Sequence, residues 1–599
     1  MSELRHDDRA DFDDADRGRI GGLEPCVVTN TEGRVVWDND SFGFLDAECP
    51  DTANPSLWRQ SQLCAKQGLY EVTDGIYQVR GLDLSNMTLV EGDTGVIVID
   101  PLVSREVAAA ALRLYRDHRG ERPVTGVIYT HSHIDHFGGV AGVVDGEVPI
   151  LAPEGFLEHA VAENVYAGTA MLRRGMYHTG SPLPRSPRGL IGTGLGQTAS
   201  TGEVTLLAPT VDITHTGQEE VLDGVRIIFQ VTPNTEAPSE MNFFFPDRRA
   251  LCLAENATHN LHNVLTLRGA VVRDARMWSR YLNEAITLFG GRADVAFASH
   301  HWPTWGRERI ATFVSQQRDL YAYLHDQTLR MLNQGLTGAE IAEVIELPPE
   351  LDGAWHTRGY YGSVSHNVKA IYQRYLGWFD GNPAHLWEHP PVESARRYVD
   401  CLGGADAVVA KAREYIAHDD PRFAVQLLNH AVFAEPGHAG AKELLAEVYQ
   451  RLGFGAENGT WRNFYLTGAQ ELREGIPTGT DEVNAAGMAG ALTVEQLFDS
   501  IAIRVDGPRA WTAGFSVEWT FTDLGVSHRM VLSNGALIHW PAEPSGGADL
   551  RVTLVKADLL ALLAGRGTGG ARLDGDPKVL QRLAEVLDEP DPSFAIVTP

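Results

Sequence analysis

The chain contains 599 residues, of which 43% are hydrophobic, and it carries a formal net charge of −29 at pH 7. A chain of this size can bury a large core and is expected to divide into two to four domains. The negative charge argues against nucleic acid and anionic membranes as partners, because basic surfaces bind polyanions. An anionic substrate would need a local basic pocket. No apolar run is long enough to span a membrane.

The cysteines and the N-terminus indicate a cytoplasmic protein. The five cysteines, which show no metal-site spacing and are expected to be reduced thiols, are Cys26, Cys49, Cys64, Cys252 and Cys401. Residues 1–22 are rich in Asp and Arg and lack the apolar core of a secretory signal. We predict that these first residues are disordered.

The first regular elements in the chain are predicted to be strands. Residues 75–101 contain three apolar runs that Gly and Asp separate. A helical pattern with Ala108, Leu112 and Tyr115 follows, and it leads to the apolar run of residues 124–129. Strands with interleaved helices predict an α/β domain, arranged as an αββα sandwich.

Residues 130–136 place three imidazoles and a carboxylate in one loop directly after a strand. In an extended segment alternate residues share a face, so His131 and His133 can converge on one metal ion. Asp135 and His136 lie further along the turn, where they can bind a second ion. The alternatives are a histidine-rich surface loop or a single structural zinc, but structural sites favour cysteine, which this loop lacks.

Three later strands also end in residues that can bind a metal. Glu236 follows an apolar strand of residues 225–229, and Glu255 follows another of residues 250–254. His300 and His301 follow a third, of residues 293–299. A carboxylate at the end of a buried strand is costly unless it is paired or bound to a cation. Before these strands, residues 151–201 are rich in Gly and Pro and form either a lid over the site or an ordinary surface loop.

The histidine loop resembles the hallmark of the metallo-β-lactamase superfamily, which includes hydrolases of lactams, thioesters, phosphodiesters and sulfate esters. The resemblance narrows to the alkylsulfatases of that superfamily, and it extends from about residue 75 to the C-terminus. The matching stretches are residues 81–87, 131–136, 235–238, 254–269, 299–303 and 359–367. What distinguishes the alkylsulfatases is glutamate at the third and bridging metal-ligand positions, where other members of the superfamily have histidine and aspartate.

The resemblance implies two zinc ions per chain. One would be held by His131, His133 and Glu236, the other by Asp135, His136 and His300, and Glu255 would bridge them. His301 stays open as an alternative to His300. A water activated by the two cations would attack the sulfate ester, so catalytic roles are assigned to Glu255 and Asp135.

Several residues are candidates for binding the sulfate group, a singly charged anion that guanidinium and amide donors recognise. Arg268 and Asn263 come shortly after Glu255 in the sequence. Tyr177 is a weaker candidate for the same pocket. His366 is a candidate acid for the leaving oxygen.

The second half of the chain predicts two more domains. Helical patterns at residues 405–417, 422–434 and 439–452 follow a Pro-rich linker. By the resemblance, residues 386–490 form an all-α dimerisation domain, which implies a homodimer; a monomeric helical spacer is the alternative. Residues 491–599 show an α+β pattern that resembles sterol-carrier-protein domains, which shelter an aliphatic chain. Ordinary core packing explains the same pattern.

The sequence therefore predicts a catalytic domain over residues 23–385 that hydrolyses alkyl sulfate esters to alcohol and inorganic sulfate. The alternatives are another hydrolase of this fold, acting on a phosphodiester or thioester, and a non-catalytic lipid-binding protein. A flavin-linked di-iron oxidoreductase would need a flavin domain that the sequence does not show. The alkyl chain length, the class of carbon and the bond that breaks are left open.

Overall fold

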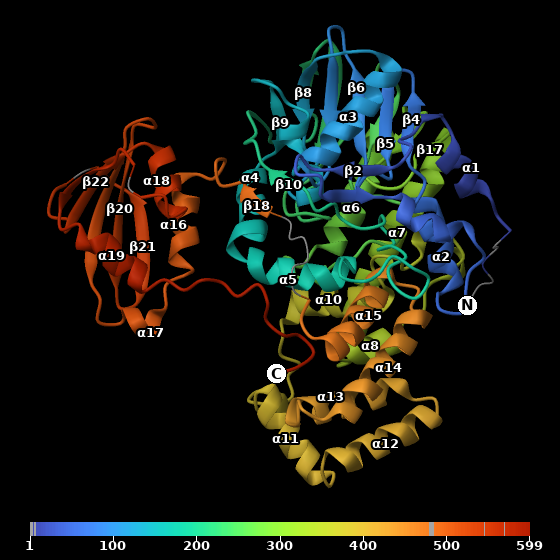
Figure 1. Cartoon of the computed structure of the whole chain (residues 1–599). Helices are drawn as coiled ribbons and strands as arrows, with labels where there is room; N and C mark the ends of the chain where they lie inside the picture. Colours follow the sequence, from blue (N-terminus) through green and yellow to red (C-terminus); the bar gives the residue numbers. More distant parts are fainter. Residues whose placement is uncertain (1–3, 5–6, 478–483, 544, 568) are drawn as a thin grey trace.

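A computed structural model describes residues 4, 7–477, 484–543, 545–567 and 569–599. The chain forms three lobes (Figure 1). The largest holds most of the first 380 residues, a helical lobe lies below it, and a smaller lobe of strands and helices, coloured orange to red, lies to one side. The predicted classes, α/β, then all-α, then α+β, are confirmed.

Two sheets form the centre of the large lobe. The first contains, in spatial order, β1 (Arg19–Gly21), β4 (Gly68–Thr73), β5 (Ile76–Arg80), β6 (Met87–Glu91), β7 (Val96–Ile99), β8 (Val124–Ile128), β9 (Ile150–Pro153) and β11 (Val211–Ile213). The second contains β12 (Glu219–Leu222), β13 (Val225–Val231), β14 (Met241–Phe245), β15 (Ala250–Cys252), β16 (Val295–Phe297) and β17 (Thr304–Trp305). The strands predicted from residues 75–101 are therefore present.

The alternation of side chains along these strands explains why the sheets face each other. Ile97 and Ile99 of β7 pack in one buried cluster with Phe229 and Phe243 of the second sheet. The intervening Val98 points to the opposite face, where helix α3 (Arg105–Arg119) covers the first sheet. Because each strand is buried on both faces, its sequence is almost continuously apolar.

Helices cover the outer face of the second sheet in the same way. Phe244 and Leu251 pack against Trp278 of α6 (Ala275–Ala285) and Leu320 of α7 (Arg307–Leu332). The layers are thus helix, sheet, sheet and helix, as the sequence predicts. This arrangement brings the ends of several strands to one edge of the sandwich.

The helical lobe contains the predicted helices. Helices α8 (Gly338–Val344) and α10 (Val364–Leu376) pack against α7. The helices that follow in the chain are α11 (Pro391–Cys401), α12 (Ala405–Ala417), α13 (Pro421–Ala434), α14 (Ala439–Gly455) and α15 (Gly459–Glu474). Arg462 of α15 is fully buried and donates to the backbone carbonyls of Thr52 and Gly189. Because a buried guanidinium needs such acceptors, α15 is fixed against the catalytic lobe.

The third lobe is a five-stranded sheet with helices against it. Its spatial order is β21 (Ala536–Pro541), β20 (Val526–Ser533), β19 (Phe515–Phe521), β22 (Leu550–Leu554) and β23 (Arg572–Gly575), and its main helices are α16 (Val494–Ala502), α18 (Lys556–Leu563) and α19 (Lys578–Glu585). The preceding strand β18 (Asn484–Gly487) pairs with β10 (Glu203–Thr205) of the catalytic lobe. The predicted likeness to sterol-carrier proteins stays a prediction.

The predicted disorder of residues 1–22 is wrong for the part of this segment that the structure describes. Helix α1 (Ala10–Asp16) packs Phe12 into a small apolar cluster, and β1 pairs with β4. Its acidic residues are paired: Asp11 binds Arg59 at 2.9 Å, and Asp14 binds Arg309. The negative charges of this segment, which suggested disorder, are thus neutralised by arginines that are far away in the sequence but close in the fold. Residues 1–3 and 5–6 lie outside the described residues.

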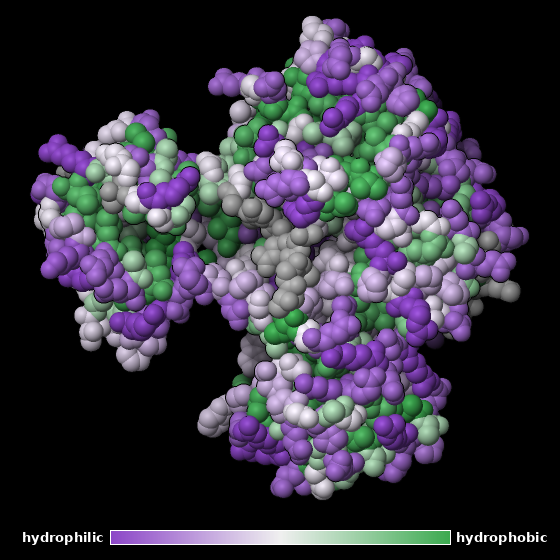
Figure 2. Space-filling model, viewed as in Figure 1, coloured by the Kyte–Doolittle hydropathy of each residue, from purple (hydrophilic) through white to green (hydrophobic). Residues whose placement is uncertain are grey.

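The surface is mostly polar on the face drawn in Figure 2, where smaller hydrophobic areas occur in each lobe. Among the residues that the structure describes, no helix combines the length and the apolar character needed to cross a bilayer.

Candidate metal centre and substrate cavity

Strand ends from both sheets place the candidate metal ligands at one edge of the sandwich. The histidine loop, residues 131–136, follows β8 of the first sheet. Glu236, Glu255 and His300 follow β13, β15 and β16 of the second sheet. All of these side chains are buried. The sequence thus predicted which strand ends converge.

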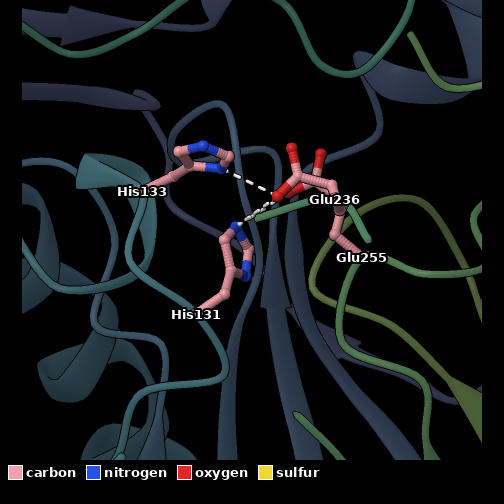
Figure 3. A group of neighbouring side chains, drawn as sticks. All are labelled: His131, His133, Glu236 and Glu255. Carbon is pink, nitrogen blue, oxygen red and sulfur yellow. Dashed lines mark ion pairs between the residues drawn. The ribbon is translucent and has the colours of Figure 1, made fainter. Parts of the chain in front are cut away.

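The first ligand group consists of His131, His133, Glu236 and Glu255 (Figure 3). Glu236 Oε2 lies 3.1 Å from His131 Nε2 and 2.8 Å from His133 Nδ1. Glu255 Oε2 lies 3.3 Å from His131 Nε2. Two imidazoles and two carboxylates therefore point at one small volume.

The second ligand group consists of Asp135, His136 and His300. Asp135 Oδ2 lies 3.2 Å from His136 Nε2 and 3.5 Å from His300 Nε2. Glu255 Oε2 is 3.2 Å from each of the same two nitrogens. Glu255 therefore contacts both groups, which is the position of a bridging ligand.

The hydrogen bonds of these side chains fit divalent cations. Nε2 of His131, His136 and His300 is buried and has no hydrogen-bond partner within the described part of the chain. In each ring the other nitrogen is held: Nδ1 of His136 by Asp100 at 2.9 Å, Nδ1 of His131 by Thr130 at 2.9 Å, and Nδ1 of His300 by the Leu84 carbonyl at 3.0 Å. Metal-binding histidines are oriented in this way, so the donor set fits zinc and related metals.

The geometry separates His300 from His301. Both ring nitrogens of His301 already have partners, since Nδ1 accepts from the His259 amide at 2.9 Å and Nε2 lies 3.1 Å from the Gly194 carbonyl. His301 has a left-handed backbone, with φ of 62°, and it belongs to neither ligand group found among the described residues. The structure therefore favours His300, as the sequence analysis did.

A cavity of about 240 Å³ opens onto both ligand groups. Its polar lining includes His133, Asp135, Glu236, Glu255, Arg268 and Arg273. One face of helix α5 (Gly168–Thr179) supplies Met171, Leu172 and Met176. The helix lies within the segment for which the sequence allowed either a lid or a surface loop, and it covers the cavity. A site with an ionic end and an apolar wall suits an amphiphilic anion.

Three segments of the chain match known protein families. Residues 80–300 match the metallo-beta-lactamase superfamily, residues 337–475 match alkyl sulfatase dimerisation, and residues 482–599 match alkyl sulfatase C-terminal. A linear primary-alkylsulfatase from Pseudomonas sp is 47% identical over 615 residues, which cover 100% of this chain and 91% of that relative. The chain belongs to the alkylsulfatase family.

Two further alkylsulfatases are nearly as similar. An (R)-specific secondary-alkylsulfatase from Pseudomonas sp is 45% identical and is matched over 100% of this chain and 92% of its own length. The solved structure of the stereoselective inverting sec-alkylsulfatase Pisa1 from Pseudomonas sp. is 44% identical, covers 100% of this chain and 96% of its own, and superposes with a TM-score of 0.97. This chain and Pisa1 therefore share one architecture over their whole matched length, and the predicted family is confirmed.

Sequence reasoning missed three polar residues that contact the ligand groups of this alkylsulfatase centre. Arg273 Nη2 lies 2.5 Å from Glu236 Oε1, and His262 Nε2 lies 2.8 Å from Glu255 Oε1. Glu240 is buried behind both glutamates and accepts from the amides of Glu236 at 3.0 Å and Glu255 at 3.1 Å. Each occurs in or near a matching stretch, but only the fold brings them to the ligands.

The pKa shifts follow from this crowding of charges. Burial alone would raise the pKa of Glu236, but Arg273 and His133 lower it to about 2. Burial would likewise raise the pKa of Glu255, but His300 and His262 hold it well below its ordinary value. Both glutamates are therefore carboxylates at neutral pH, as metal ligands must be.

Arg268 lies in the cavity as predicted, and it is paired with Glu163. Glu163 Oε2 also lies 3.5 Å from His133 Nε2. Burial would raise the pKa of Glu163, but Arg268 and His133 hold it well below its ordinary value. Asn263 accepts from Arg273, and its buried Nδ2 has no partner in the described residues. Asn263 does not line the cavity itself.

The predicted substrate contact of Tyr177 is contradicted by its position. Its hydroxyl donates to Glu471 of α15 at 2.8 Å, and the ring is not part of the cavity wall. Tyr177 lies on the face of α5 that packs against the helical lobe. The sequence gave no indication of Glu471, which is 294 residues away.

The predicted acid role of His366 is also contradicted. His366 is outside the cavity lining, and its Nδ1 accepts from Trp461 Nε1 at 2.9 Å. Burial, with Lys369 nearby, lowers its pKa to about 3, so the ring holds almost no proton at neutral pH. His178 and Tyr361, by contrast, do line the cavity, and His178 Nε2 lies 2.9 Å from the Tyr361 hydroxyl oxygen.

Proposed function

We propose that this alkylsulfatase hydrolyses sulfate monoesters of aliphatic alcohols, releasing the alcohol and inorganic sulfate, with two zinc ions per chain. One observation carries the proposal: Glu255 Oε2 lies within 3.3 Å of Nε2 of His131, His136 and His300, at the ionic end of a cavity with an apolar wall. Such a carboxylate joins two cation sites and faces the substrate space.

We divide the ligands between the two ions as the family resemblance implies. His131, His133 and Glu236 would hold one ion, and Asp135, His136 and His300 would hold the other, with Glu255 shared between them. Bound there, two divalent cations would supply a hydroxide equivalent near neutral pH and stabilise negative charge in the transition state. Nitrogen and oxygen donors without cysteine are typical of catalytic zinc sites.

The chain's own residues would bind and orient the ester. The guanidinium of Arg268 would donate to the sulfate oxygens, and Arg273 would add positive charge beside Glu236. Glu163 holds Arg268 in place and orients His133 from the side opposite Glu236. Asn263 accepts a hydrogen bond from Arg273 and so helps to position it. Its effect on the substrate would be indirect, because it lies in the same loop as Arg268.

The alkyl chain would lie along helix α5. Met171, Leu172 and Met176 project from one face of this helix into the cavity. Methionine is flexible and polarizable, so it adapts to chains of different shape. The proposal therefore includes long aliphatic sulfates as substrates, for primary or secondary carbons.

The bond that breaks can be tested directly. The relative Pisa1 is described as inverting, and inversion requires attack at carbon. If this chain acts in the same way, sulfate itself is the leaving group, and because sulfate is a weak base no acid is needed at His366. Hydrolysis in oxygen-18 water would then place the label in the alcohol, whereas attack at sulfur would place it in the sulfate.

We propose the remaining features by the same reasoning. The match of residues 337–475 to alkyl sulfatase dimerisation supports a homodimer. We place domain limits near residues 385 and 490, and the linker before α11 and the strand β18 support them. We also place the protein in the reducing cytoplasm, and the five free cysteines support this location. The last domain, a five-stranded sheet with helices against it, would shelter an alkyl chain as sterol-carrier-protein domains do.

Sulfate release from alkyl sulfates of graded length, measured on the purified full chain, tests the function. We expect turnover that a chelator removes and zinc restores, with about two zinc ions per active chain by elemental analysis. Phosphodiester and thioester substrates serve as controls. Turnover of those esters without any on alkyl sulfates, or full activity with less than one metal ion, would reject the proposal.

A further inference from the structure

The last residues of the chain return from the third lobe to the cavity. In Figure 1 the red segment leaves the third lobe and runs back toward α5 and α10. Pro592 lines the substrate cavity together with α5. Val597, five residues later, packs into the buried core of the helical lobe. The segment of residues 592–597 therefore contacts both the substrate space and the helices behind it.

A buried ion pair anchors this segment. Arg173 of α5 and Glu471 of α15 are paired, and both are almost fully buried. Arg173 Nε donates to the Phe594 carbonyl at 2.9 Å, and Glu471 Oε1 accepts from the Ile596 amide at 3.0 Å. Glu471 Oε2 also accepts from Tyr177 at 2.8 Å.

These contacts make the segment part of the wall and not a loose end. A buried charge pair is costly unless its remaining donors and acceptors are satisfied. The backbone of residues 594 and 596 satisfies one donor of Arg173 and one acceptor of Glu471. Without the segment, the pair would need water, which would enter beside α5.

The segment lies away from the anion-binding end. Met171 Sδ is 3.3 Å from Arg268 Nη1, whereas Met176 Sδ is 4.0 Å from Arg173 Nη1. Five residues along a helix correspond to about 7.5 Å. Arg173 itself is only two residues from Met171, but its guanidinium contacts Met176, and this contact therefore lies farther along α5 from Arg268 than Met171 does. We expect only a longer alkyl chain to reach this part of the cavity.

We propose that residues 592–597, locked by the Arg173 and Glu471 pair, form a specificity-determining wall that favours long alkyl chains. The inference rests on the proposed function and adds to it a preference for long alkyl chains. Pro592 supplies apolar surface to the end of the alkyl chain that lies away from the sulfate group. The hydrogen bonds of Arg173 and Glu471 to the backbone of residues 594 and 596 keep water out of this wall. A short alkyl sulfate remains near Arg268 and does not contact this wall.

A matched pair of substitutions tests the proposal. Ile596→Pro removes the amide that donates to Glu471, whereas Ile596→Ala keeps it and shortens only the side chain. Each apolar methylene that loses its contact lowers affinity about fourfold. We expect Ile596→Pro to lower the ratio of kcat/KM for dodecyl sulfate to that for butyl sulfate by about tenfold, mainly through KM. Ile596→Ala should change this ratio less than about threefold.

A variant that ends at Asp591 provides a second measurement. It should show the same loss of preference for dodecyl sulfate and keep its zinc content and its kcat/KM for butyl sulfate. If it fails to fold, the Ile596 pair still decides the question. An unchanged ratio in Ile596→Pro, or an equal change in both Ile596 variants, overturns the proposal.

The outcomes also separate this inference from the proposed function. If the unmodified chain hydrolyses no alkyl sulfate, the proposed function is wrong, and the wall has no substrate to select. If the unmodified chain is active and the variants keep its chain-length profile, only the wall is wrong. Equal losses for both substrates would indicate a purely structural role and would also reject the inference.

Discussion

Glu240 is predicted to hold the two glutamate ligand loops together. Its Oε2 accepts from the Glu236 amide at 3.0 Å and, at a longer 3.4 Å, from the Ala237 amide. Its Oε1 accepts from the Glu255 amide at 3.1 Å. All of these residues are buried. Glu240→Ala therefore leaves buried N–H groups without a partner in both loops.

The expected size of the effect follows from these contacts. An unsatisfied buried donor costs about 1–3 kcal/mol. A loss of about 2 kcal/mol in local stability speeds amide exchange roughly 30-fold. The amides of Glu236 and Glu255 should lose the most protection, and Ala237, whose bond is longest, should lose less. Metal affinity should fall by about 10–100-fold, as is usual when a group that orients a ligand is removed.

Hydrogen exchange by mass spectrometry, on peptides that cover residues 234–238 and 253–257, measures this directly. Glu240→Gln is the matched control because it keeps one acceptor and nearly the same volume, so its losses should be smaller than those of Glu240→Ala. If Glu240→Ala leaves exchange at both loops unchanged, the reasoning is refuted. The same holds if exchange rises equally across the catalytic lobe, because the role is local.

Three further predictions concern the site. Arg268→Ala should raise KM for an alkyl sulfate roughly 10–100-fold, because it removes one charge-assisted hydrogen bond to the sulfate group. The zinc content should stay unchanged, and wild-type kinetics in this variant would contradict the assignment. Glu255→Gln should lower bound metal below two ions and abolish sulfate release, and an active variant with two zinc ions would refute the bridging role. His300→Ala should lose about one metal ion by elemental analysis, whereas His301→Ala should keep both because its nitrogens bond within the protein; equal metal loss in the two variants would reverse this assignment.

The parts of the fold that sequence patterns predicted are those with local causes. The strand of residues 515–521 alternates apolar and polar residues, and it forms β19. The histidine loop carries its ligands within six residues, so its role can be inferred without the fold. Glu236 and Glu255 could be assigned because each follows an apolar strand and the resemblance gave them roles.

The residues that sequence reasoning misplaced depend on contacts between distant segments. Tyr177 and Arg173 lie one turn apart on α5, and both reach Glu471, nearly 300 residues away. Asp14 and Arg309, whose pairing orders the N-terminal helix, are 295 residues apart. A composition argument treats such acidic residues as solvated, and it cannot identify the arginine that will neutralise each one.

The negative charge of the chain does not conflict with an anionic substrate. At physiological ionic strength fields decay over about 8 Å, so most surface carboxylates have little effect inside the cavity. There the carboxylates of Glu236 and Glu255 are committed to the ligand groups, and Glu163 is paired with Arg268. If both ligand groups hold divalent cations, as proposed, the ionic end of the cavity would be positive although the protein carries a formal net charge of −29. The overall charge therefore argues against extended polyanions as partners, because they need a broad basic surface, but it permits a single sulfate group that needs only this pocket.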